Sequence, residues 1–88
     1  MNNHTITAIS PRAAFLAAET ALAAAVATHE ATISAHFAAI DHGCPDTVLD
    51  FTEAACTAAA ANVMRCAQTV NQAQHMLDAH IRAATAHI

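Results

Sequence analysis

The sequence predicts an all-α fold, an antiparallel hairpin of two long helices. The chain of 88 residues contains one glycine and only two prolines, so few residues interrupt helical structure. Hydrophobic residues make up 56% of the chain, and most of them are alanine, the residue with the highest helix propensity. Larger apolar residues recur at helical spacing on both sides of a single Gly- and Pro-containing segment. These observations favour few elements, each of them long.

The first helix is expected over residues 11–41. Ser10-Pro11 has the pattern of an N-cap residue followed by proline in the first helical position. Gly43 supplies the left-handed residue that commonly ends a helix, and Pro45 prevents its continuation. The turn is therefore expected at residues 42–45. Steps of seven, four and three residues place the larger apolar side chains on one face: Phe15, Leu22, Val26, Ile33, Phe37 and Ile40.

The second helix is expected over residues 46–87. Thr47-x-x-Asp50 resembles a capping box with aspartate in place of glutamate, and Asp46 suits the positive end of the helix dipole. A heptad row of mostly apolar residues predicts a coiled-coil-like seam, and it consists of Leu49, Cys56, Val63, Val70 and Leu77. A companion row consists of Ala60, Ala67, Gln74, Ile81 and Ile88.

A four-residue turn forces the two helices to lie antiparallel within one domain, residues 1–88.

Few of the side chains are large, so the hairpin alone would be marginally stable. The opposite face of the first helix carries only small side chains, namely Ala14, Ala17, Ala21, Ala24, Ala25, Ala31, Ala35 and Ala39. These alanines either serve helicity alone or permit close approach of a neighbouring helix.

We therefore expect dimerisation into a four-helix bundle, as a homo-dimer or a hetero-dimer with a similar hairpin. The seam of the second helix also continues beyond the part that the first helix can cover. The expected interface residues are Phe15, Leu22, Val26, Ile33, Phe37, Ile40, Leu49, Val63, Val70, Leu77 and Ile81.

Charge excludes several classes of partner. The net charge is −4, with three arginines and no lysine, so no basic patch for nucleic acid can form. An anionic membrane surface is disfavoured for the same reason. The stretch 13–40 is interrupted by charged residues and histidines, so we expect no membrane span. Residues 1–10 lack a basic residue followed by an apolar run, so we expect a cytoplasmic protein or one exported without a classical signal peptide.

No combination of residues predicts catalysis or a cofactor. Of the seven histidines, only His75 has a potential ligand at helical metal-site spacing, in His75-x-x-Asp78. Two ligands do not make a site, so we predict no metal. Cys44 and His42 form the only short-range Cys/His pair, in an exposed turn. Catalytic residues and cofactors are therefore expected to be absent.

The three cysteines cannot all pair within one chain. Cys56 and Cys66 lie about 15 Å apart along one helix, too far for a disulfide. We expect these two to be buried structural thiols. Cys44, in the turn, is expected to be the most exposed thiol.

Nearly the whole chain resembles small helical-hairpin proteins associated with type VII (ESX) secretion, in the subgroup without a Trp-x-Gly turn. The matching features are Pro11-Arg12 leading to Leu16-Ala17, the turn His42-Gly43, and Phe51 early in the second helix. Members of that family typically carry a Tyr-x-x-x-Asp/Glu export signal, whereas this chain contains no tyrosine. The resemblance implies an exported hairpin that assembles through its helix faces.

A second resemblance is to type III secretion needle subunits, which are also helix–turn–helix proteins of this size. It is carried by 65–68 (Arg-Cys-Ala-Gln) and 76–81 (Met-Leu-Asp-Ala-His-Ile). We therefore expect a non-enzymatic, self- or partner-associating hairpin, an exported substrate or structural subunit of a secretion system. The alternative is a cytosolic coiled-coil adaptor or a small inhibitor that docks on a larger complex.

Overall fold

The computed structural model describes residues 10–86, which form two helices and, within that range, no strand. Helix α2 spans Pro11–Asp41 and helix α3 spans Asp46–Ala86. The ranges expected from the sequence were 11–41 and 46–87, of which residue 87 lies outside the described residues. The fold is all-helical, as predicted.

Local hydrogen bonds explain where α2 begins. The Ser10 side chain accepts a hydrogen bond from the backbone N–H of Ala13 at 3.1 Å, and the Ser10 carbonyl accepts from Ala14 at 2.9 Å. Pro11 follows as the first helical residue, where its missing N–H costs nothing. The predicted N-cap is therefore formed.

The C-terminus of α2 ends in a Schellman motif. Gly43 has a φ of 66°, in the left-handed region. The N–H groups of Gly43 and Cys44 donate to the carbonyls of Ile40 and Ala39, both at 3.0 Å. These bonds satisfy carbonyls that the end of the helix would otherwise leave unpaired.

Helix α3 begins at Asp46, two residues before the position that the predicted capping box requires. The Pro45 carbonyl accepts the first two hydrogen bonds of the helix, from Val48 at 2.9 Å and Leu49 at 3.1 Å. Thr47 is therefore already the second helical residue and cannot act as the N-cap of a box with Asp50. Asp46 remains in the first turn, where its charge suits the helix dipole.

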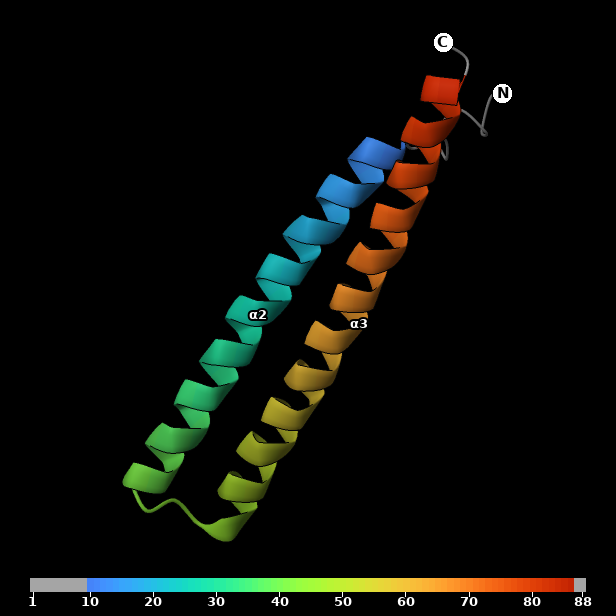
Figure 1. Ribbon diagram of the computed structural model, residues 1–88. Coiled ribbons are helices and arrows are strands. Elements are labelled where there is room, and N and C mark those ends of the chain that lie inside the picture. The colour runs from blue at the N-terminus through green and yellow to red at the C-terminus, as the bar shows by residue number, and fades with distance from the viewer. Residues whose placement is uncertain (1–9, 87–88) are drawn as a thin grey trace, which may run out of the picture.

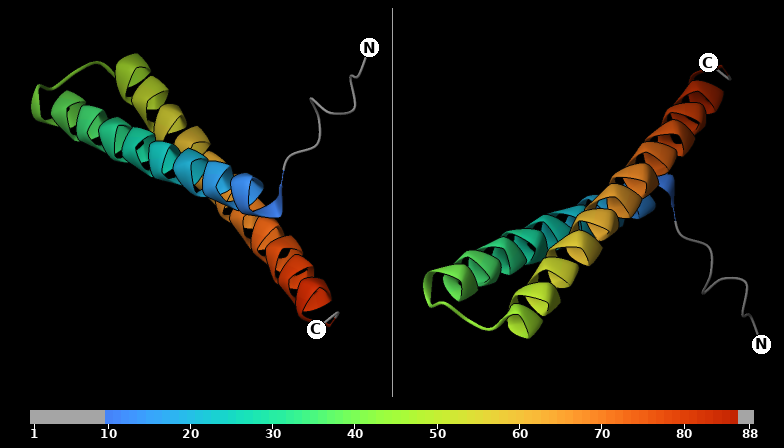
Figure 2. Two further views of the ribbon diagram at one scale, coloured as in Figure 1. Left: turned by 90° about the horizontal axis from the view of Figure 1, so that it is seen from above. Right: turned by 90° about the horizontal axis from the view of Figure 1, so that it is seen from below.

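The two helices pack against each other along an antiparallel hairpin, and α3 extends past the start of α2 at the open end (Figure 1). Seen from above and below, they cross at an angle towards that end (Figure 2). The principal extents are 65 × 32 × 13 Å. The smallest extent is close to the diameter of one helix, about 10–12 Å. The hairpin is thus a single layer of two helices, whereas most domains pack two layers around a core.

The helices meet along residues that recur at alternating steps of three and four, which we call the interhelix seam. On α2 the buried and half-buried seam residues are Pro11, Phe15, Ala18, Leu22, Ala25, His29, Thr32, His36 and Ala39. On α3 the seam consists of Leu49, Thr52, Cys56, Ala59, Val63, Cys66, Val70, Ala73 and Leu77. The predicted heptad row of α3 therefore lies on the seam. Of its second row, Ala60 and Ala67 flank the seam, Gln74 and Ile81 are exposed, and Ile88 lies outside the described residues.

The apolar stripe expected on the first helix does not act as one packing face. Phe15 and Leu22 are half-buried on the seam, whereas the larger residues nearer the turn are exposed. Alanines, threonine and histidines occupy the corresponding part of the seam. Within the single hairpin the seam follows other positions, because a small or polar side chain can pack between two helices while contributing little to the hydropathy pattern.

Candidate association surface

Within the described part of the chain, the interior of the hairpin contains no large side chain that is fully buried. Within residues 10–86 the buried hydrophobic residues are four alanines, at positions 18, 25, 39 and 59. An alanine side chain buries little apolar area, and hydrophobic stabilisation scales with that area. Contact between α2 and α3 therefore leaves most of the larger apolar side chains accessible.

Four of these side chains form an apolar strip along the turn-proximal half of α2. Val26, Ile33 and Ile40 each follow a seam residue by one position, and Phe37 follows His36 in the same way. One residue corresponds to a rotation of about 100° around a helix. The four side chains therefore project from the same side of α2, roughly a quarter turn from the seam. Their exposed fractions run from 36% at Ile33 to 60% at Phe37.

Helix α3 contributes a methionine to the same broad face of the hairpin. In two antiparallel right-handed helices, the positions that directly follow seam residues project to the same side of the pair. Met64 follows the seam residue Val63 and is 66% exposed. We define the outer apolar face as Val26, Ile33, Phe37 and Ile40 of α2 together with Met64 of α3. Carboxylates border its turn-proximal part, at Glu30, Asp50 and Glu53.

The opposite broad face has a different character. On α2 it consists of exposed small residues, namely Ala17, Ala21, Ala24, Ala31, Ala35 and Ala38, which we call the alanine face. On α3 the same side carries Val48, Phe51 and Met76, and Phe51 is 74% exposed. Of the alanines that the sequence placed together, Ala25 and Ala39 lie instead on the seam.

One polar contact crosses the seam. His36 Nδ1 lies 2.6 Å from Thr52 Oγ1, and the Thr52 hydroxyl also lies 3.1 Å from the Leu49 carbonyl. A hydroxyl has a single hydrogen, and the carbonyl can only accept. When that hydrogen is donated to Leu49, His36 carries a hydrogen on Nδ1 and donates it to Thr52. The contact fixes one layer of the hairpin, in which His36 lies opposite Thr52.

The expected interface residues divide between two surfaces. Those half-buried on the seam are Phe15, Leu22, Leu49, Val63, Val70 and Leu77. Those left exposed are Val26, Ile33, Phe37, Ile40 and Ile81. Only the second group is available to another chain while the hairpin stays intact. Sequence reasoning missed the seam positions held by His29, Thr32 and His36, although their steps of three and four residues match those of the α3 row.

The residues considered for chemistry are not brought together. No group of three or more His, Cys, Asp or Glu side chains suited to a metal ion occurs within the described range. Asp78 accepts a hydrogen bond from Gln74 at 3.3 Å, and His75 is exposed. In the turn, His42 Nδ1 donates to the Ala38 carbonyl at 2.7 Å, an interaction that caps α2. These contacts are those of helix surfaces and helix ends.

The cysteines and the surface concavities give no further site. Cys44, Cys56 and Cys66 are free, and all three are half-buried, so the turn thiol does not stand out as an exposed one. A shallow depression is lined by Asp50, Glu53, Ala54, Thr57, Ala58 and Ala61. All of these residues belong to α3, so the depression is the surface of one helix. Neither described helix is long and apolar enough to cross a membrane.

Comparison of the chain with protein-family models, curated proteins and solved structures gives no significant match. The two packed helices define the class of protein, which is an all-α, two-helix hairpin.

Proposed function

We propose that this hairpin is a non-enzymatic association module. It pairs through the outer apolar face with a second helical hairpin, either another copy of itself or a similar chain, and so forms a four-helix bundle. The observation that carries the proposal is the absence of a large buried side chain from the described interior, combined with an exposed apolar strip on α2. Contiguous exposed apolar surface of this kind typically marks a protein–protein contact.

The shape of the molecule supports the same proposal. A single layer of two helices leaves both broad faces open to solvent. Stacking a second hairpin on one face would supply the second layer that most domains have. The side chains from Val26 to Ile40 would then move from water into an apolar environment, at roughly 25 cal/mol for each Å² of apolar area buried.

The proposal is tested by a matched pair of charge insertions on α2. Phe37→Asp places a carboxylate in the outer apolar face, and Ala35→Asp places one on the alanine face two residues away. Both positions are exposed, so circular dichroism should show helicity retained in both variants. Light scattering coupled to size exclusion should give a single-chain mass for Phe37→Asp and a two-chain mass for Ala35→Asp, because a carboxylate buried without a partner is strongly unfavourable. The reverse pattern would contradict our choice of face.

We further propose that the assembled hairpin is an exported substrate or structural subunit of a secretion system. The two sequence resemblances support this role. The alternative, an adaptor or inhibitor inside the cell, is favoured by the absence of tyrosine from the chain. Detection of the native protein in culture supernatant, without markers of lysis, would support export. Its recovery only from the cell fraction would support the alternative.

A further inference from the structure

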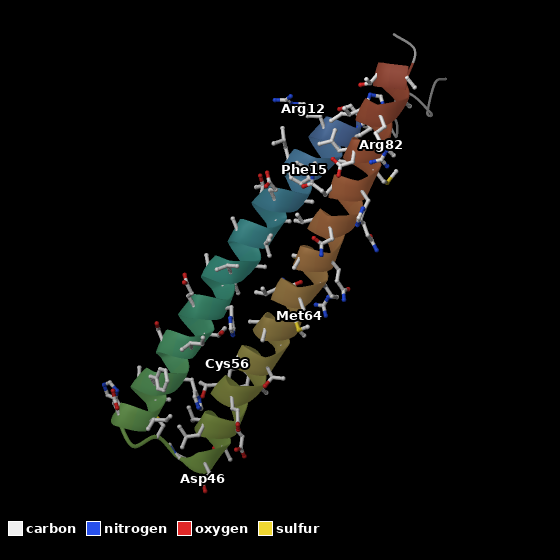
Figure 3. All side chains as sticks on the ribbon, viewed as in Figure 1. Arg12, Phe15, Asp46, Cys56, Met64 and Arg82 are labelled. Carbon is white, nitrogen blue, oxygen red and sulfur yellow. The ribbon has the colours of Figure 1, made fainter. Side chains whose placement is uncertain are left out.

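Charge is distributed unequally along the length of the hairpin. Five of the seven carboxylates lie in the half that contains the turn, at Glu30, Asp41, Asp46, Asp50 and Glu53. No arginine lies between the first and last of these residues. Arg12 and Arg82 belong to the other half, together with two carboxylates, Glu19 and Asp78, and Arg65 lies near the middle of α3. Figure 3 shows Arg12 and Arg82 at the open end and Asp46 at the opposite end.

We propose that two copies pair antiparallel, with the acidic turn end of each beside the arginine-bearing open end of the other. This inference rests on the self-association proposed above and adds the orientation. A parallel pair would bring two sets of five carboxylates to the same end, and like charges held close together destabilise a complex. An antiparallel pair separates these sets and places the open end, with Arg12 and Arg82, beside each of them.

Several charged residues lie on the outer face, including Arg12, Glu19 and Asp78 of the open half, whereas Arg65 precedes the seam residue Cys66 and projects to the alanine face. Arg12 follows the seam residue Pro11, and Glu53 follows the seam residue Thr52. By the geometry that defines the outer apolar face, both side chains project to that face. When two such faces meet antiparallel, Arg12 of one copy approaches the end of its neighbour that carries Glu53. Exposed pairs of this kind add little affinity, but they select one orientation over another.

The apolar residues permit this orientation. The outer apolar face lies on the turn side of α2, between Val26 and Ile40. Because Leu16, which is 50% exposed, directly follows the seam residue Phe15, it continues the strip towards the open end. In an antiparallel pair, Leu16 of each copy faces the turn-proximal strip of the other. Each α3 overhang then extends beyond its own α2 alongside the turn of the neighbour.

The orientation is tested by measuring distances between nitroxide spin labels with pulsed electron paramagnetic resonance. In the full chain carrying Cys56→Ala and Cys66→Ala, the remaining Cys44 places one label at each turn. A second variant adds Cys44→Ala and Ala13→Cys and labels the open end. The two positions lie at opposite ends of α2, whose 31 residues span about 46 Å. Antiparallel pairing predicts label separations above roughly 30 Å in each variant alone, and separations below roughly 25 Å in their mixture.

The other outcomes separate the orientation from the association itself. Separations below roughly 25 Å within each variant alone, with long ones in the mixture, would show a parallel pair and overturn the inference. Absence of dipolar coupling together with a single-chain mass would overturn both the inference and the self-association on which it rests.

Discussion

Gly43 is the residue of the turn whose backbone conformation excludes most side chains. Its φ of 66° is strained for an L-residue, although no atom lies within 4 Å of the position that a Cβ would occupy. We therefore predict that Gly43→Ala lowers the free energy of unfolding by about 1 kcal/mol through backbone strain alone. Gly43→Asn should cost less, because asparagine tolerates this region. Urea unfolding followed by circular dichroism measures both changes, and equal stability of the alanine variant and the wild type would contradict the prediction.

The bond between His36 and Thr52 is the second residue-scale feature with a measurable energy. We predict that His36→Ala and Thr52→Val show a coupling energy of about 0.5–1.5 kcal/mol in a double-mutant cycle, the usual net contribution of one hydrogen bond. Thr52→Val preserves shape and removes only the hydroxyl. The control is Thr20→Val, because the Thr20 hydroxyl bonds only to the Leu16 carbonyl of its own helix. Strictly additive effects of the two seam substitutions would show that the bond contributes nothing to stability.

At the scale of the elements, alanine in the seam sets how closely α2 and α3 approach. Ala25 is 4% exposed, and its neighbour Ala24 is exposed on the alanine face. We predict that Ala25→Leu costs about 1–3 kcal/mol of unfolding free energy, because the larger side chain forces the helices apart. Ala24→Leu, the same chemical change one residue earlier, should alter stability by less than about 0.5 kcal/mol. Similar losses in both variants, measured by urea unfolding, would contradict this assignment of the seam.

The ends of the helices could be predicted because their signals are local. Ser10 with Pro11 starts α2, and Gly43 ends it, each through bonds to residues nearby in the chain. The start of α3 was less predictable. Thr47 and Asp50 have the spacing of a capping box, yet the helix begins at Asp46, and the Pro45 carbonyl takes the first bonds.

The candidate site was only partly predictable, because large apolar residues and close helix packing favour different faces of α2. The hydropathy pattern follows size and selects residues such as Val26 and Ile33. Close approach of two helices favours small side chains, and the seam accordingly contains Ala25 and Thr32. On α3 the two criteria select the same row, because its seam includes Val63 and Val70. The heptad row of α3 was therefore recognisable from the sequence, whereas the seam residues of α2 were not.

At the scale of the whole molecule, the hairpin has the dimensions of an incomplete domain. Its smallest extent is 13 Å, and its radius of gyration is 19.4 Å, whereas a compact chain of this length would have about 12 Å. Many of the apolar side chains that would form a core in a compact domain are exposed instead, several of them on the outer apolar face. Association on that face would supply the missing layer, and stability would then depend on protein concentration.

The most direct test of this account is sedimentation equilibrium of the wild-type protein from low to high micromolar concentration, with helicity recorded on the same samples. We predict a mass that rises from one chain, 9.1 kDa, towards two chains as concentration increases, with helix content rising or constant. A mass of one chain at high micromolar concentration, with full helicity, would show that the hairpin is stable without a second copy. That result would contradict self-association as its function.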